Sequence, residues 1–189
     1  MDKLATSIHS PICTIGHGNR PADEFSSLLR TSDIECLVDV RAFPGSRRHP
    51  QFGRAELERA LAAAGIQYVW EGASLGGRRK PRSDSLHTAL RHPSFRAYAD
   101  HMETAEFRSG IVRLLQLASS MHAAVMCAER LPWQCHRYMI SDFLVAGDVQ
   151  VRHLIGKGTV RDHTLRSEAR VTNAGLIYDV GTQGDFALE

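Results

Sequence analysis

Apolar segments that favour strands alternate along this chain with segments of helical periodicity. Short apolar runs with the length and residue types of β-strands occupy residues 12–15, 36–40, 66–70, 123–127 and 149–155. Between them, apolar residues recur every three or four positions, which predicts helices at 21–30, 54–64, 95–102, 104–120 and 135–146. This alternation is typical of α/β proteins. We therefore expect a single α/β domain with Rossmann-like layering: a mainly parallel open sheet of about five strands, with helices on both faces.

The pattern is less regular in two places. Residues 71–85 are rich in Gly, Arg, Pro and Ser, so we expect a long loop there, and loops of this length are often functional. After Gly156 the strand and helix signals weaken, and residues 176–180 could form one more strand or a tail. We therefore expect one domain over residues 1–189, with its core at about 12–155 and a C-terminal extension at 157–189.

Length and composition exclude several classes of protein. The chain has 189 residues, 43% of them apolar, which suits one domain with a substantial core. It has no run of 18 apolar residues, so we expect no membrane partner. The N-terminus lacks the layout of a signal peptide, and the four cysteines are too few and too dispersed for a secreted disulfide framework. We therefore expect a cytoplasmic protein; its oligomeric state is not specified by these features.

Positive charge is concentrated in one part of the chain. The net charge is only +2, but residues 41–82 contain nine Arg or Lys against three acidic residues. Such an excess favours an anionic small molecule or nucleic acid as partner, although a solvated basic surface is the alternative. The basic residues of the predicted loops are Arg47, Arg48, Arg78, Arg79, Lys80 and Arg82.

The densest group of reactive side chains lies where a predicted strand ends and a predicted helix begins. Two thiols, a carboxylate, an imidazole and a guanidinium fall within eleven residues: Cys127, Glu129, Cys135, His136 and Arg137. Open α/β sheets bind ligands beyond the carboxyl ends of their strands, and a helix N-terminus can activate a thiol and hold an anion. Cys135 begins the predicted helix, so we favour it slightly as the more activated thiol. Consecutive helical residues diverge by about 100°, so we expect that Cys135, His136 and Arg137 cannot all face one point.

Other predicted strands also end in polar residues, and these ends should lie along one edge of the sheet. From them and from the segment above we take as candidate catalytic residues Cys127, Cys135, Glu129, Asp39 and His17. The candidate substrate-binding residues are Arg41, Arg137, His136, Asn19, Gly16 and Gly18. Each of these functional roles has a structural alternative: the thiols could be buried and inert, Asp39 and Arg41 could form a mutually satisfied ion pair, and His17 could be structural.

The two cysteines also raise the question of a metal or redox site. Structural zinc sites usually show paired short spacings, whereas Cys127 and Cys135 are separated by seven residues. The C-x-x-C signature of redox pairs is absent as well. We therefore expect no metal or other cofactor, and keep zinc bound by Cys127, Cys135, His136 and a carboxylate, or a disulfide of the two cysteines, as less favoured alternatives.

Four motifs occur in a fixed order: residues 14–19 (TIGHGN), residues 38–41 (VDVR) with Pro44 and Ser46, residues 75–77 (LGG), and residues 127–137 (CAE…P..CHR). In this combination, over residues 12–155, the chain resembles the domain of unknown function 488 family of prokaryotic proteins. The resemblance implies a compact α/β domain and supplies no reaction.

Three functions follow from these observations. We favour an enzyme, a hydrolase or transferase, that uses a cysteine nucleophile with carboxylate or histidine acid–base groups on an anionic, nucleotide- or nucleic-acid-related substrate. The first alternative is a nucleic-acid-binding module that uses the basic loops, with Trp70 or Phe52 stacking on bases. The second alternative is a metal- or redox-sensing domain.

Overall fold

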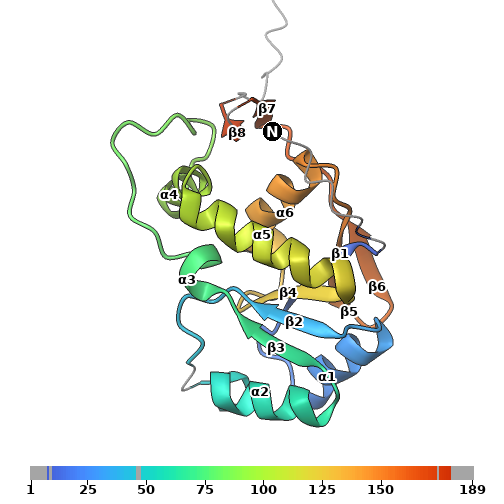
Figure 1. The fold of residues 1–189 in the computed structure, drawn as a ribbon. Helices are drawn as coiled ribbons and strands as arrows, with labels where there is room; N and C mark the ends of the chain where they lie inside the picture. The colour runs from blue at the N-terminus through green and yellow to red at the C-terminus, as the bar shows by residue number, and fades with distance from the viewer. Residues whose placement is uncertain (1–7, 9, 46–47, 174, 180–189) are drawn as a thin grey trace, which may run out of the picture.

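A six-stranded sheet with helices on both faces forms the body of the protein (Figure 1). The structure is a computed structural model that describes residues 8, 10–45, 48–173 and 175–179. Five strands run parallel in the order β3-β2-β4-β1-β5, and β6 is added antiparallel to β5. Their bounds are β1 Ile12–Gly16, β2 Cys36–Asp39, β3 Gln67–Trp70, β4 Ala123–Cys127, β5 Val151–Gly156 and β6 Thr159–Asp162. The expected mainly parallel α/β domain is confirmed.

The helices form two layers because successive strand residues point to opposite faces of the sheet. Helices α1 (Ala22–Thr31) and α2 (Arg54–Ala63) pack on Ile15 and Leu37 through residues such as Phe25, Leu29, Leu57 and Leu61. Helices α4 (Pro93–Met102), α5 (Ala105–Ser120) and α6 (Arg137–Ala146) cover the other face, where Val38 and Val125 meet Tyr98, Phe107 and Met139. Both faces of the central strands β1, β2 and β4 are therefore buried.

The order of the strands brings distant polar residues together. Strand β4 lies between β1 and β2, with Gly16 in register with Cys127 and Asp39 with Met126. Parallel strands end at the same edge, so the residues that follow β1, β2 and β4 become neighbours. This edge carries the site described below.

Three details differ from the sequence-based expectations. The sheet has a sixth strand, β6, whose four residues are all exposed. The sequence therefore contained no apolar run that would have predicted it. The expected loop at 71–85 contains a short helix, α3 (Gly72–Leu75), where Glu71 is anchored by Arg113 at 2.7 Å. The helix expected from residue 135 begins at Arg137, because a 3-10 turn at Pro132–Gln134 (η2) precedes it and Cys135 is extended. A second 3-10 turn, η1, spans Pro50–Phe52.

The C-terminal extension is tied to the core. It forms a hairpin of β7 (Ala169–Thr172) and β8 (Gly175–Tyr178), so the strand expected at 176–180 lies at 175–178, and residue 180 is outside the described residues. A buried polar chain links Thr14, His153, His163 and Asp142 through contacts of 2.7, 2.9 and 2.9 Å, and the Tyr178 hydroxyl donates to Asp142. Within the described residues, no helix is long and apolar enough to cross a membrane.

Candidate functional site

A cavity of about 600 Å³ opens at the carboxyl ends of β2 and β4. Its size is within the range of small-molecule sites. We call it the strand-end pocket, and its lining residues are Arg41, Ala42, Phe43, Gly77, Arg78, His92, Ser94, Phe95, Cys127, Ala128, Glu129, Trp133, Gln134, Cys135 and His136.

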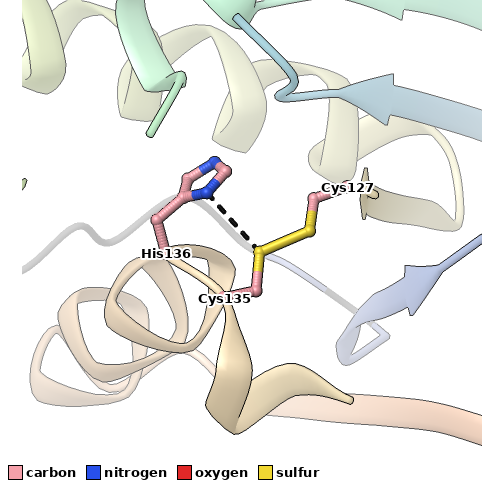
Figure 2. A group of neighbouring side chains, drawn as sticks. All are labelled: Cys127, Cys135 and His136. Carbon is pink, nitrogen blue, oxygen red and sulfur yellow. Dashed lines mark hydrogen bonds between the residues drawn. A yellow bond between two sulfur atoms is a disulfide. The ribbon is translucent and has the colours of Figure 1, made fainter. Parts of the chain in front are cut away.

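Two buried cysteines form part of the pocket wall. Cys127 ends β4 and Cys135 precedes α6, and their sulfur atoms are joined in a disulfide (Figure 2). Both side chains are almost fully buried, yet both line the pocket. The other two cysteines, Cys13 and Cys36, are free and buried, and burial raises the pKa of each thiol to about 11. The chain therefore separates a pair of pocket sulfurs from two inert core thiols.

His136 turns one ring nitrogen toward these sulfurs. Its Nε2 lies 3.2 Å from the Val40 carbonyl oxygen, which can only accept, so Nε2 carries the proton and donates. Its Nδ1 therefore keeps a free lone pair, and it lies 3.5 Å from Cys135 Sγ (Figure 2). Burial lowers the pKa of His136 to about 4, so the ring is neutral near pH 7. Gly77 packs against the ring, and a Cβ there would lie 2.5 Å from Nδ1.

Arg137 is a buried cation beside the other sulfur. Its side chain is 1% exposed, and Nη1 lies 2.9 Å from Cys127 Sγ. The guanidinium also donates to the carbonyl oxygens of Glu129 and Arg130. Among the described residues no carboxylate hydrogen-bonds it, and the exposed Glu129 side chain attracts it only at longer range. Burial lowers the pKa of Arg137 to about 9, which leaves it charged at neutral pH.

His136 and Arg137 thus both contact the pair that Cys135 forms with Cys127. Helix geometry had led us to expect that these three residues could not face one point. That expectation assumed that Cys135 was helical. Cys135 instead has φ −137° and ψ 150°, and the Arg137 backbone N–H donates to its sulfur at 3.5 Å. The change of backbone direction before α6 lets His136 approach one sulfur and Arg137 the other.

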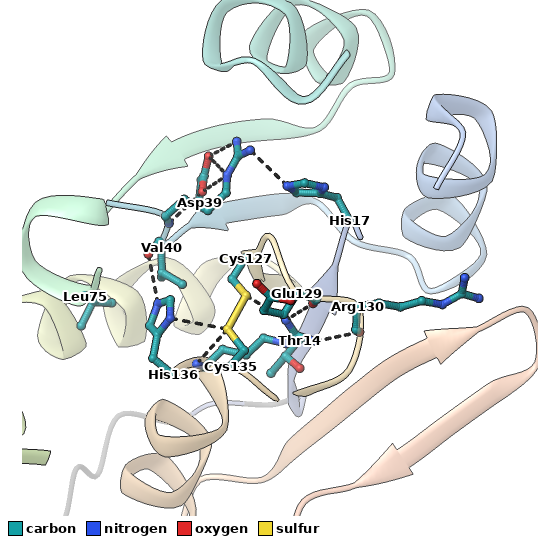
Figure 3. The surroundings of a disulfide bond; sticks show 12 residues. Thr14, His17, Asp39, Val40, Leu75, Cys127, Glu129, Arg130, Cys135 and His136 are labelled. Atoms are coloured by element: carbon teal, nitrogen blue, oxygen red, sulfur yellow. Dashed lines mark hydrogen bonds and ion pairs between the residues drawn. A yellow bond between two sulfur atoms is a disulfide. The ribbon is translucent and has the colours of Figure 1, made fainter. Parts of the chain in front are cut away.

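Asp39 and Arg41 form a mutually satisfied ion pair (Figure 3). Arg41 Nε lies 2.9 Å from Asp39 Oδ1 and Nη2 lies 2.6 Å from Oδ2, while the Tyr68 hydroxyl donates to Oδ2 at 2.7 Å. Asp39 is fully buried and does not line the pocket. Arg41 lines the pocket, but its guanidinium is already engaged, so the geometry matches the ion-pair alternative rather than a general base beside an anion clamp.

His17 continues this network away from the pocket. Its Nδ1 donates to the Gly18 carbonyl at 2.9 Å, so Nε2 accepts from Arg41 Nη1 at 3.3 Å. The ring stacks on Phe52, with centroids 4.4 Å apart. Burial, the largest cause, lowers the pKa of His17 to about 4. His17 is therefore neutral, bonded at both nitrogens and absent from the pocket wall, which matches its structural alternative.

The glycines of the 14–19 motif approach protein backbone rather than a ligand. A Cβ on Gly16 would overlap the Glu129 carbonyl, and one on Gly18, which has φ +54°, would lie 2.9 Å from Arg130 Cβ. These glycines let the loop after β4 pack on the end of β1. Asn19 is exposed and does not line the pocket.

The basic loop residues divide into different environments. Arg78 is exposed at the pocket, with its guanidinium 5.4 Å from the ring centre of Phe43. Arg79 donates to the carbonyls of Gly76 and Ala73 and so supports α3. Arg48 is exposed away from the pocket, and Arg47 lies outside the described residues.

Sequence reasoning missed the aromatic side chains of the pocket. Phe43 is 70% exposed and Trp133 44% exposed, and both line it with Phe95. The residues considered for stacking are used elsewhere: Trp70 donates to the Arg41 carbonyl at 2.9 Å, and Phe52 is buried against His17. The sequence feature that could have indicated an aromatic pocket residue was Trp133, a large apolar residue between two reactive cysteines.

Fold and site together define an α/β domain with a sulfur-containing pocket at its strand ends. The chain belongs to the family described as Domain of unknown function DUF488, whose model matches residues 21–144. The resemblance seen in the sequence motifs is thus confirmed. The matched region includes every residue that lines the strand-end pocket. No curated protein and no solved structure matches the chain.

Proposed function

We propose that the protein is a thiol enzyme that acts on an anionic substrate in the strand-end pocket, with Cys127 as its nucleophile. The observation that carries the proposal is the contact between Cys127 Sγ and Arg137 Nη1 at 2.9 Å. A buried guanidinium without a hydrogen-bonded carboxylate is costly, and a thiolate at Cys127 would neutralise it. The thiolate is the nucleophilic form of cysteine, so the same contact that balances charge also activates the sulfur.

The neighbouring groups suit transfer or hydrolysis through a covalent adduct. Cys127 would attack an electrophilic carbon or phosphorus of the substrate, forming a bond from sulfur while the leaving group departs with the bonding electron pair. Glu129 lines the pocket and is exposed, so its carboxylate can take a proton from the water or acceptor that releases the adduct, while the first leaving group takes its proton from solvent. Cys135 completes a disulfide with Cys127, so only the reduced protein has a free nucleophile.

The pocket lining supports a substrate that combines negative charge with a planar ring. Arg78 offers an exposed cation, and the exposed rings of Trp133 and Phe43 line the same pocket, with the Arg78 guanidinium 5.4 Å from the Phe43 ring centre. Base–aromatic stacking with a nearby cation is how proteins commonly hold nucleotides. We therefore propose a nucleotide or nucleic-acid-related substrate. An extended nucleic-acid-binding surface has less support, because Arg79 serves α3 and Arg82 pairs with Asp84 and Glu103.

The nucleophile is tested by mapping thiol alkylation in reduced, chelator-treated protein at pH 7. We expect iodoacetamide to modify Cys127 before Cys13 and Cys36, and the Cys135→Ser variant to retain this fast reaction. The matched control is Cys13→Ser, which should leave the Cys127 rate unchanged. Slow alkylation of Cys127, at the rate of the two core thiols, would exclude it as an activated nucleophile.

The substrate class is tested by tryptophan fluorescence during titration with nucleoside monophosphates and triphosphates. We expect saturable quenching that Trp133→Phe abolishes and that the Arg78→Met variant weakens. Trp70 remains in both variants as the internal reference. The absence of saturable quenching across all four bases would contradict the nucleotide proposal.

A further inference from the structure

The reduced cysteine pair and His136 have the donor set of a metal centre. The two sulfurs and a ring nitrogen of His136 all lie within 4.8 Å of one another, on three positions that the fold buries or half-buries. Two thiolates and one imidazole are ligands that Zn²⁺ prefers, and together they would balance its charge. The seven-residue spacing had counted against a metal in the sequence, but the strand end and the residue before α6 bring the ligands together.

The hydrogen bonding of His136 prepares it for this role. Its Nε2 donates to the Val40 carbonyl, so the nitrogen that faces the sulfurs is the one with the free lone pair. Histidines that bind metals almost always donate their other ring nitrogen to a carbonyl, a carboxylate or water, which fixes the tautomer and the ring orientation. Gly77 contributes by leaving room for the ring, since any side chain there would meet Nδ1.

The backbone spacing of the two cysteines also accommodates an ion. Their Cα atoms are 7.6 Å apart. Disulfides usually join Cα atoms about 4.4–6.8 Å apart, so these two positions are held wider than is usual for a disulfide. When both cysteines are reduced, their sulfurs can separate toward an ion without any approach of the backbone.

A second candidate metal site, outside the pocket, has no histidine nitrogen with a free lone pair facing the other groups. His87 is buried, with Nε2 3.3 Å from Glu103 and 3.9 Å from Asp100. The Tyr178 backbone N–H donates to its Nδ1 at 3.2 Å, so Nε2 must carry the proton of the neutral ring. The nitrogen that faces the carboxylates therefore carries the proton and has no lone pair to offer a metal.

We infer that reduced Cys127 and Cys135, together with His136, bind one thiophilic divalent cation of the Zn²⁺ type, with its fourth position open to the strand-end pocket. The ion would bind the Cys127 sulfur, which the proposed function uses as its nucleophile. Metal binding and thiol catalysis are therefore alternative states of one site, and the metal is a regulator of the proposed activity. This regulatory role rests on the proposed function, whereas metal binding itself does not.

The test is a titration of reduced, chelator-treated full-length protein with Zn²⁺, and with Co²⁺ as a spectroscopic probe. We expect one equivalent of metal per chain, thiolate-to-Co²⁺ absorption in the near ultraviolet, and protection of two of the four thiols from alkylation. The protected thiols should map to Cys127 and Cys135. Protein oxidised to the disulfide should bind no metal with these properties.

Variants identify the ligands. Cys135→Ser and His136→Ala should each lower Zn²⁺ affinity at least tenfold, and Cys13→Ser should not change it. Should His136→Ala fail to fold, Gly77→Ala gives a second test, because it displaces the same ring. Stoichiometric binding that survives Cys135→Ser unchanged, or no binding by reduced wild-type protein, would overturn the inference. Fast Cys127 alkylation in chelator without any metal binding would overturn this inference alone, and metal binding with a slow, unactivated Cys127 would overturn only the thiol enzyme.

Discussion

The Nη1 atom of Arg137 lies 2.9 Å from Sγ of Cys127, and this contact joins the first turn of α6 to the end of β4. The other acceptors of the guanidinium are backbone carbonyls, which carry no net charge. Among the described residues, the Cys127 sulfur is thus the one hydrogen-bonded partner of the Arg137 guanidinium that can become an anion. The sequence separation of ten residues is bridged by the loop that Gly16 and Gly18 allow to pack on β1.

Replacing Arg137 by Met should slow the alkylation of reduced Cys127 at pH 7 by about tenfold. The reason is that a loss of about 1.4 kcal/mol of thiolate stabilisation raises the pKa of the thiol by about one unit. The measurement is the rate of iodoacetamide labelling at Cys127 across pH 6–9, in chelator. Arg59→Met, at an exposed helix position, is the control and should not change the rate. An unchanged Cys127 rate in Arg137→Met would show that the cation does not activate the thiol.

Replacing Gly77 by Ala should destabilise the protein and disturb His136, because the new methyl group would lie 2.5 Å from Nδ1. Overpacking of this kind typically costs about 1–3 kcal/mol. The free energy of unfolding in urea measures the effect. Gly45→Ala is the matched control, since a Cβ at that position meets no atom within 4 Å. Equal stability of the two variants would contradict the close packing of residue 77 on the imidazole.

Replacing Asp39 by Asn should cost about 3–5 kcal/mol, the usual effect of leaving one charge of a buried pair without its partner. Asp39 is fully buried and Arg41 nearly so, and the Tyr68 hydroxyl also depends on this carboxylate. Chemical denaturation gives the change in unfolding free energy. Glu56→Gln breaks the exposed pair with Arg59 and should cost less than about 1 kcal/mol. A small effect of Asp39→Asn would mean that the ion pair is dispensable for the strand end.

Stability should fall as the pH decreases from 6.5 toward 4. Burial lowers the pKa of His17 and of His136 to about 4, and that of His153 to about 3. Their unfolded pKa is about 6.5, so in this window the unfolded chain binds protons that the folded chain does not. Acid therefore favours unfolding, and the full contribution of each histidine is present above pH 6.5.

Unfolding free energies measured in urea at pH 7.0, 6.0 and 5.0 follow this loss. His17→Gln removes one of the three groups and should make the decline with pH shallower. A decline of the same slope in wild type and His17→Gln would show that His17 does not titrate in this way.

The sequence was sufficient for those parts of the fold that rest on periodicity and parallel pairing. The apolar strand runs and helical spacings identify the layers, and the shared direction of the strands brings Asp39 and Cys127 to one edge. The expectation failed where backbone direction is decided by tertiary contacts. The turn at Pro132–Gln134 displaces the start of α6 by two residues, and that shift decides where His136 and Arg137 point.

The roles of individual polar residues were also beyond the sequence. Asp39 and His17 stand at strand ends, as a catalytic pair would, but hydrogen bonds already occupy them. No local pattern distinguishes a satisfied buried ion pair from an active one, because the difference lies in partners such as Tyr68, 29 residues away along the chain. The exposed pocket aromatics Phe43 and Trp133 had no periodic signal, since Phe43 lies in a loop and Trp133 in the three-residue turn η2.

The position of β4 between β1 and β2 has a consequence for how this domain can be divided. The family model matches residues 21–144, a segment that omits both β1 and β5. A protein cut to that region would expose one whole edge of β4, the strand that carries Cys127, with its backbone donors and acceptors unpaired. Such an edge invites pairing with other chains. The smallest autonomous unit should therefore begin before Ile12 and extend through β5, beyond both ends of the segment that the family model matches.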